Sequence, residues 1–274
     1  MFSRDPLAHW KGDPYVRQIY ALIATLVLTL SLGSTPASAI TNGDLDGEGH
    51  PYVGLMTFQT SDGGFRCSGT LISSTLFLTA GHCTFGVIGK VQIWFDADVQ
   101  SGIPGNGYPS DGDVSGTAYA HPLYDDNAFF LHDLGVVVLD EPWQLDTYAE
   151  LPGLSANNAW RAANPGKHAF YTAVGYGLQR INPAQIVQQR VRMVANPYLV
   201  QIDRGLVGDF SLLLSNNASS GGTCFGDSGG PNFIGSSNVI GGVTSFGLNG
   251  TCGGTGGVYR IDQPDDLNWL ATFD

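Results

Sequence analysis

Apolar and polar residues alternate in short stretches along the first half of the chain, and this alternation predicts β-strands. HPYVGLMTFQT (50–60) and KVQIWFDADV (90–99) follow the pattern. FRCSGTLISSTLFLTAGHC (65–83) predicts two strands on either side of the polar break at Ser73 and Ser74. LGVVVLD (134–140) is a continuous apolar run, which is typical of a strand buried on both faces.

The second half repeats this pattern after an interruption. PWQLDTYAELPGLSANN (142–158) has neither period, so we expect an inter-domain linker over Leu151–Trp160. Strands are predicted in HAFYTAVGYG (168–177), QQRVRMV (188–194), NVIGGVTSFG (238–247) and GGVYRI (256–261).

The C-terminal stretch 263–273 favours a helix, with Asp262 as its N-cap and Pro264 in its first turn. The pattern therefore predicts an all-β chain in two halves, in the form of barrels or sandwiches, with a short C-terminal helix.

Composition agrees with many short strands joined by turns. The 274 residues include 38 glycines and 14 prolines, and 43% are hydrophobic, as in a globular protein. The chain carries 12 basic and 24 acidic residues, a net charge of −12. This charge argues against nucleic acid or an anionic membrane surface as a partner.

Residues 1–39 have the features of a secretory signal peptide. Basic residues precede an apolar run over Ile19–Leu32, and Ala37 and Ala39 occupy the A-x-A cleavage positions. We expect cleavage after Ala39 and a secreted, extracellular product without stable membrane association. The long stretch before the apolar run contains two aspartates and leaves open the alternative that the segment is kept as a membrane anchor.

Four cysteines remain after this cleavage, and secretion would place them where disulfides persist. Four cysteines allow three pairings, and the two local pairs, Cys67–Cys83 and Cys224–Cys252, are the economical choice. No C-x-x-C or H-x-x-x-H spacing supports a zinc site, so we expect neither a metal nor another cofactor.

Three short segments carry residues capable of nucleophilic catalysis: LTAGHC with His82, HDLGVVVLD with Asp133 and CFGDSGGP with Ser228. GDSGG also fits the nucleophile motif of α/β-hydrolases, but those enzymes need a histidine after the serine. All six histidines precede Ser228, which excludes that order. The remaining order of His, Asp and Ser is that of the chymotrypsin group.

The chain from Ile40 to its end resembles the secreted serine proteases of the chymotrypsin/trypsin family. The resemblance is carried, in the family's order, by ITNG, CSGTLISSTLFLTAGHC, HDLGVVVL, AVGYG, CFGDSGGP, VTSFG and GGVYRI. It implies two antiparallel β-barrels with the active site in the cleft between them. The N-terminal barrel would span 40–158 with His82 and Asp133, and the C-terminal barrel would span 159–274 with Ser228.

Each predicted catalytic residue has a physical role. His82 can accept the proton of the Ser228 hydroxyl and return it to the leaving amine, because imidazole titrates near neutral pH. Asp133 would fix the tautomer of His82, and the backbone N–H groups of Gly226 and Ser228 would bind the oxyanion. Ser245 matches the family position that hydrogen-bonds the catalytic aspartate.

The resemblance also gives a role to the predicted mature N-terminus. In this family the new α-amino group pairs with the aspartate before the catalytic serine, here Asp227. Cleavage after Ala39 would expose Ile40 directly, so we expect export and activation to be a single event.

Primary specificity follows from three glycines. The resemblance places Gly222 at the floor of the specificity pocket and Gly247 and Gly257 on its walls. We expect an open, uncharged and deep pocket that favours large apolar or aromatic residues. A trypsin-like preference for Arg or Lys remains the alternative.

The sequence therefore predicts a monomeric, secreted serine endopeptidase that acts on polypeptides and can meet protein protease inhibitors. A catalytically silent relative that uses the same scaffold for binding is the rival hypothesis.

Overall fold

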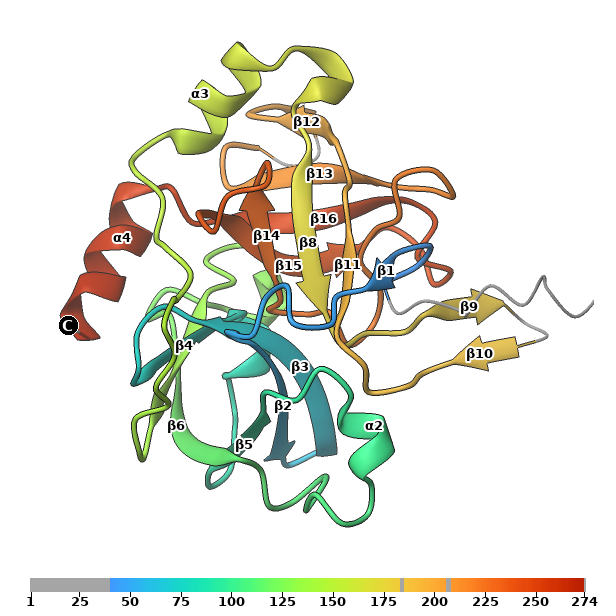
Figure 1. The fold of residues 1–274 in the computed structure, drawn as a ribbon. Coiled ribbons are helices and arrows are strands. Elements are labelled where there is room, and N and C mark those ends of the chain that lie inside the picture. Colours follow the sequence, from blue (N-terminus) through green and yellow to red (C-terminus); the bar gives the residue numbers. More distant parts are fainter. Residues whose placement is uncertain (1–39, 183–184, 206–207, 274) are drawn as a thin grey trace, which may run out of the picture. The chain divides into compact units, whose positions relative to one another are not determined.

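The computed structural model describes residues 40–182, 185–205 and 208–273 (Figure 1). The predicted signal segment 1–39 lies outside these residues. Within them, no helix combines the length and the apolar character needed to cross a membrane. Strands dominate the described chain and a short helix ends it, which confirms the predicted fold class.

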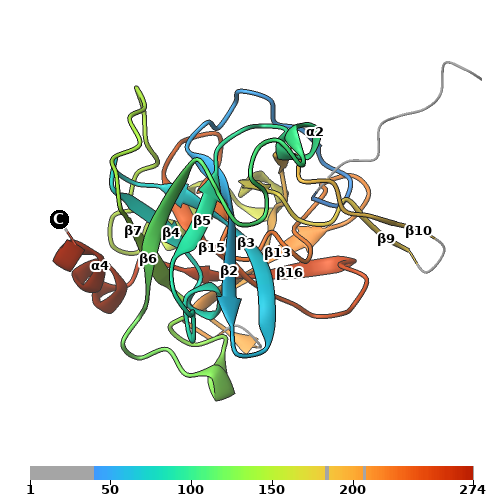
Figure 2. The same ribbon diagram turned by 90° about the horizontal axis from the view of Figure 1, so that it is seen from below.

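Six strands of the first half close into a barrel in the order β2-β3-β4-β7-β6-β5, which Figure 2 shows from below. The strands are β2 (Val53–Thr60), β3 (Gly63–Leu71), β4 (Leu76–Thr79), β5 (Val91–Trp94), β6 (Val114–Ala120) and β7 (Gly135–Leu139). As the apolar run predicted, Val136 and Val137 of β7 are both fully buried although they point to opposite faces. Gly116 lets β6 approach β7, because a Cβ there would lie 2.7 Å from the carbonyl oxygen of Val138.

Most strands of the second half form one eight-stranded sheet, a half barrel in the order β1-β11-β8-β14-β15-β16-β13-β12. Its strands are β1 (Asp44–Leu45), β8 (Tyr171–Gly175), β11 (Met193–Ala195), β12 (Leu199–Ile202), β13 (Ser211–Asn216), β14 (Pro231–Ile234), β15 (Ile240–Gly247) and β16 (Gly254–Arg260). A separate hairpin pairs β9 (Arg180–Asn182) with β10 (Gln185–Val187) and projects from the sheet in Figure 1. β1 belongs to the first half of the sequence but pairs with β11 at the edge of this sheet.

The described helices are α2 (Val99–Gly102), α3 (Ala156–Ala163) and α4 (Pro264–Leu270), with short 3-10 turns at Gly81–Cys83, Asp126–Ala128, Gly166–His168 and Ala271–Phe273. The predicted C-terminal helix is confirmed as α4, but Gln263 and not Asp262 occupies its N-cap position. The carboxylate of Asp262 instead accepts hydrogen bonds from Arg260 and from the backbone N–H of Asn157. The expected linker at Leu151–Trp160 is partly helical, because α3 begins inside it.

Arg192 ties the N-terminal segment to both halves. Its side chain is buried, with Nε 3.0 Å from Oδ2 of Asp46 and Nη2 donating to the carbonyl of Gly47. Nη1 donates to the carbonyl oxygens of Val53 and Phe95 and to the hydroxyl of Tyr176. These partners compensate the cost of burying the guanidinium group.

Candidate active site

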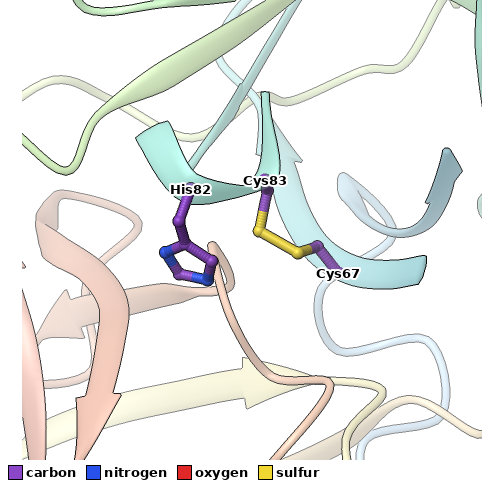
Figure 3. Close-up of side chains that lie close together, drawn as sticks. All are labelled: Cys67, His82 and Cys83. Carbon is purple, nitrogen blue, oxygen red and sulfur yellow. A yellow bond between two sulfur atoms is a disulfide. The ribbon is translucent and has the colours of Figure 1, made fainter. Parts of the chain in front are cut away.

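His82 lies in the 3-10 turn Gly81–Cys83, which follows β4, next to the disulfide Cys67–Cys83 (Figure 3). The disulfide links this turn to β3 and therefore limits its movement relative to the barrel. The second disulfide joins Cys224 to Cys252, so both predicted pairs are confirmed.

The structure brings His82 and Asp133 together across 51 residues of sequence. The Nδ1 atom of His82 lies 2.9 Å and 3.0 Å from the two carboxylate oxygens of Asp133, and the backbone N–H of His82 donates to Oδ1. Ser245 donates a hydrogen bond of 2.5 Å to Oδ2 of the same carboxylate, which is fully buried. Because Nδ1 faces Asp133, the neutral ring carries its proton there and Nε2 remains basic.

The charge of His82 is set by opposing effects. Burial alone would lower its pKa, but the charge of Asp133, its hydrogen bond and the charge of Asp126 together raise the pKa above the ordinary value. Asp126 is exposed at the start of a 3-10 turn. The imidazolium form is therefore stabilised by one buried and one exposed carboxylate.

The segment around Ser228 presents backbone donors to the same cleft. Gly226 has a φ of +95°, which favours glycine, and the carbonyl of Phe225 accepts a hydrogen bond from the N–H of Leu178. Since N–H and C=O point in opposite directions in a trans peptide, the N–H of Gly226 points away from Leu178. Across the described ranges, neither this N–H nor that of Ser228 donates to a protein acceptor.

Asp227 stabilises the segment around Ser228 through hydrogen bonds of its side chain. Its fully buried carboxylate accepts hydrogen bonds from the N–H groups of Gly177 and Cys224, at 2.8 Å and 2.9 Å. Burial raises the pKa of Asp227 to about 7, against these hydrogen bonds and the charge of Arg66, which lower it. The side chain of Ile40 is also fully buried and packs against Ala173, Met193 and Ala195.

Ser228 and His82 line one cavity of about 360 Å³. Four aromatic side chains line it, Tyr124, Phe129, Phe225 and Phe246, together with several small polar residues. Asp126 lies at the same cavity.

Of the three glycines expected around the specificity pocket, Gly247 lines this cavity, whereas Gly222 and Gly257 are not among its lining residues. A Cβ on Gly222 would meet the side chain of Asn216 at 2.4 Å, and one on Gly257 would meet the ring of Phe246 at the same distance. Side chains therefore occupy the space beside both glycines, and the expected open and deep pocket stays a prediction.

Sequence reasoning missed Asp126, Phe246 and Arg66, which all line cavities at the site. Phe246 directly follows Ser245, which the sequence had placed at the site, so the sequence could have predicted that Phe246 lies there too. Asp126 and Arg66 become visible only when the chain is folded.

Among the residues that the structure describes, two groups of side chains have the composition of metal ligands. Cys67, His82 and Cys83 lie close together, but both sulfur atoms belong to the disulfide. His121, His132 and Asp266 bring ligand atoms within 4.8 Å of one another. However, the N–H of Leu123 donates to Nδ1 of His121, so the neutral ring carries its proton on Nε2 and lacks the lone pair that a metal needs there.

Comparison with known proteins identifies the family. The family model described as Trypsin matches residues 43–266. The chain belongs to the trypsin family of serine proteases. Its relatives include chymase from Rattus norvegicus, 30% identical, and serine protease 1 from Drosophila melanogaster, 29% identical. These matches cover 77% and 78% of this chain and 83% and 77% of the relatives.

A solved structure of HL collagenase has the same fold as this protease. The two superpose with a TM-score of 0.67 over 85% of this chain and 98% of the other, at 22% sequence identity. The family match and the relatives together establish the protein as a serine endopeptidase, a hydrolase whose substrates are polypeptides.

Proposed function

We propose that the protease hydrolyses peptide bonds through an acyl-enzyme formed on Ser228, with His82 as general base and acid. The observation that carries this proposal is the hydrogen bonding of His82. Asp133 holds its Nδ1 atom, while its Nε2 atom has no hydrogen-bond partner within the described part of the chain. Ser228 lines the same two cavities as His82.

The reaction then proceeds in two steps. His82 takes the proton of the Ser228 hydroxyl as the oxygen attacks the substrate carbonyl, and it donates this proton to the departing amine. Water then repeats the attack on the acyl-enzyme. The N–H groups of Gly226 and Ser228 stabilise the oxyanion in both steps, and removal of one such donor typically lowers kcat about 100- to 1000-fold.

We propose cleavage after apolar residues. The aromatic rings of Tyr124, Phe129, Phe225 and Phe246 in the cavity support this preference, and Gly222 stands where trypsin-like relatives carry a carboxylate for Arg or Lys. The ring of Phe246 lines the cavity and lies against Gly257, so we propose that it takes up space that a large aromatic residue would need and that aliphatic residues are preferred.

We also propose secretion and activation by one cleavage, after Ala39. The buried side chain of Ile40 and the raised pKa of Asp227 support this proposal, because a buried carboxylate that makes no ion pair with a described residue gains most from a new ammonium group. N-terminal sequencing of the secreted, active protein tests it, and the expected first residue is Ile40.

Labelling with a fluorophosphonate tests the catalytic assignment directly. We expect covalent label on Ser228 in the wild type and in Ser237→Ala, a control at an exposed serine, and none in Ser228→Ala. Folded wild-type protein that takes no label would instead favour a catalytically silent scaffold.

A further inference from the structure

Arg66 stands at the active site without a role in the proposed reaction. It lies near the middle of β3 and lines a second cavity, of about 470 Å³, together with His82 and Ser228. Its Nε and Nη2 atoms lie 3.3 Å and 3.6 Å from the place that a Cβ on Gly226 would occupy. The guanidinium group therefore lies beside the residue whose N–H is proposed to bind the oxyanion.

The hydrogen-bonding capacity of Arg66 is incompletely used. Its Nη1 atom is buried and has no hydrogen-bond partner in the described chain. Asp227 is near enough for its charge to act on Arg66, but its oxygens already accept from Gly177 and Cys224. An unpaired buried donor is costly, and the incompletely compensated guanidinium group favours an acceptor that binds with the substrate in the adjoining cavity, which Arg66 lines.

A second arginine adds to the positive charge. Burial and the charge of Arg190 lower the pKa of Arg66, while a hydrogen bond with Tyr108 raises it. Arg190 lies over the ring of Tyr108 and donates to its hydroxyl. Among the described residues, neither arginine has a carboxylate within 4.0 Å, although acidic residues outnumber basic ones two to one in this chain.

The position of the cavity lined by Arg66 indicates which part of a bound substrate would contact Arg66. The cavity with Phe246 and Gly247 is proposed to hold the residue before the scissile bond. The Arg66 cavity adjoins the same His82 and Ser228 but is bounded by residues of β2 and β3, including Phe58 and Phe65. A peptide that crosses the catalytic pair therefore enters this cavity with its leaving-group segment.

We propose that Arg66, assisted by Arg190, binds a carboxylate on the leaving-group segment of the substrate. This inference rests on the proposed endopeptidase function and adds a substrate class to it. The carboxylate can come from an Asp or Glu side chain or from the C-terminus of the substrate. Asp62 and Asp126 also line the cavity and repel an acidic group, so the carboxylate must bind at the end nearest Arg66.

Paired peptides test the proposal on the full chain as it is expressed and processed. Quenched fluorescent peptides with one fixed cleavable bond carry either Glu or Gln at the second position after that bond. Two further peptides end at this position with a free carboxylate or with an amide. We expect wild-type kcat/KM to be about three- to tenfold higher for the carboxylate member of at least one pair, and this ratio to fall as salt rises.

Variants separate recognition from structural support. We expect Arg66→Gln to bring the ratio to about one and Arg66→Lys to retain part of it. Arg161→Gln removes an exposed arginine of α3 as a matched control and should leave the ratio unchanged. If Arg66→Gln slows all four peptides equally, or if wild type does not distinguish either pair, the proposal is wrong.

The pair of peptides that the wild type distinguishes shows where the bound carboxylate comes from. A preference confined to the Glu peptide indicates a side chain, and one confined to the free terminus indicates the end of the substrate. Binding of the same peptides to Ser228→Ala, measured by fluorescence anisotropy, gives the ratio without catalysis. Failure of the endopeptidase proposal would abolish cleavage of every peptide, whereas failure of the Arg66 proposal would remove only the difference within pairs.

Discussion

Replacement of Gly226 by alanine tests the proposed oxyanion site. The φ of +95° at this position costs a non-glycine residue about 1–3 kcal/mol. The new Cβ would also lie 3.1 Å from the Cα of Gly177 and 3.3 Å from Nε of Arg66. Both contacts are tighter than ordinary packing, so we expect the 225–226 peptide to rotate and its N–H to leave the cleft.

Loss of this donor should lower kcat about 100- to 1000-fold while KM changes little. Gly166→Ala is the matched control, since its φ is +68° and a Cβ there meets no atom within 4 Å. Both variants should lose about 1–3 kcal/mol of unfolding free energy in urea, but only Gly226→Ala should lose activity. Unchanged kcat in Gly226→Ala, with the stability loss present, would refute the assignment of this N–H to the oxyanion.

Three further outcomes follow from the site. Asp126→Asn removes a negative charge that favours the imidazolium form of His82, so the pKa of His82 should fall. The acid limb of the profile of kcat/KM against pH should then move to lower pH. An acid limb that does not move would contradict the charge effect. Phe246→Ala frees the space beside Gly257, and kcat/KM for cleavage after Phe relative to Leu should rise about tenfold in a peptide series; an unchanged ratio would show that Phe246 does not limit the cavity. In the unprocessed Ser228→Ala chain, the raised pKa of Asp227 makes the protonated form the stable one. The unfolding free energy should therefore decline as pH rises from about 4 to 7, by about 1.4 kcal/mol per unit at most, and this contribution should disappear after cleavage before Ile40. Identical pH slopes for the two forms in urea titrations would exclude the ion pair.

The sequence predicted the parts of the fold in which local pattern and tertiary environment agree. β2, β4, β5 and β7 lie within the stretches whose alternation or apolar run marked them, and β3 begins two residues before its stretch. The sequence did not predict β13 and β14, although both lie inside the second sheet with a strand on each side. Their sequences, SLLLSN and PNFI, are nearly all buried, and a short buried strand has no period of two to detect.

The segments with His82, Asp133 and Ser228 could be proposed as catalytic from the sequence because their chemistry and their order along the chain constrain each other. The shape of the specificity cavity could not be predicted in this way. Glycine at 222 and 257 suggested free space in the pocket. A neighbouring side chain can fill the space that the missing Cβ leaves, and the sequence does not tell which side chain that is. Here Asn216, at the end of β13, lies beside Gly222, and Phe246 of β15 lies opposite Gly257 of β16, a contact that depends on the register of the sheet.

The buried Arg192 has a consequence for how the protein can be divided. Its partners come from the N-terminal segment, from the barrel and from Tyr176, which follows β8 of the second sheet, so neither half satisfies it alone. If the chain were divided near residue 158, the second fragment would keep Arg192 without most of its hydrogen-bond acceptors, and the first would keep those acceptors without the arginine. The two fragments would therefore not fold as independent domains. We expect the intact enzyme to melt in one calorimetric transition, and split-protein reporters built at this boundary to reassemble only when both pieces are present together.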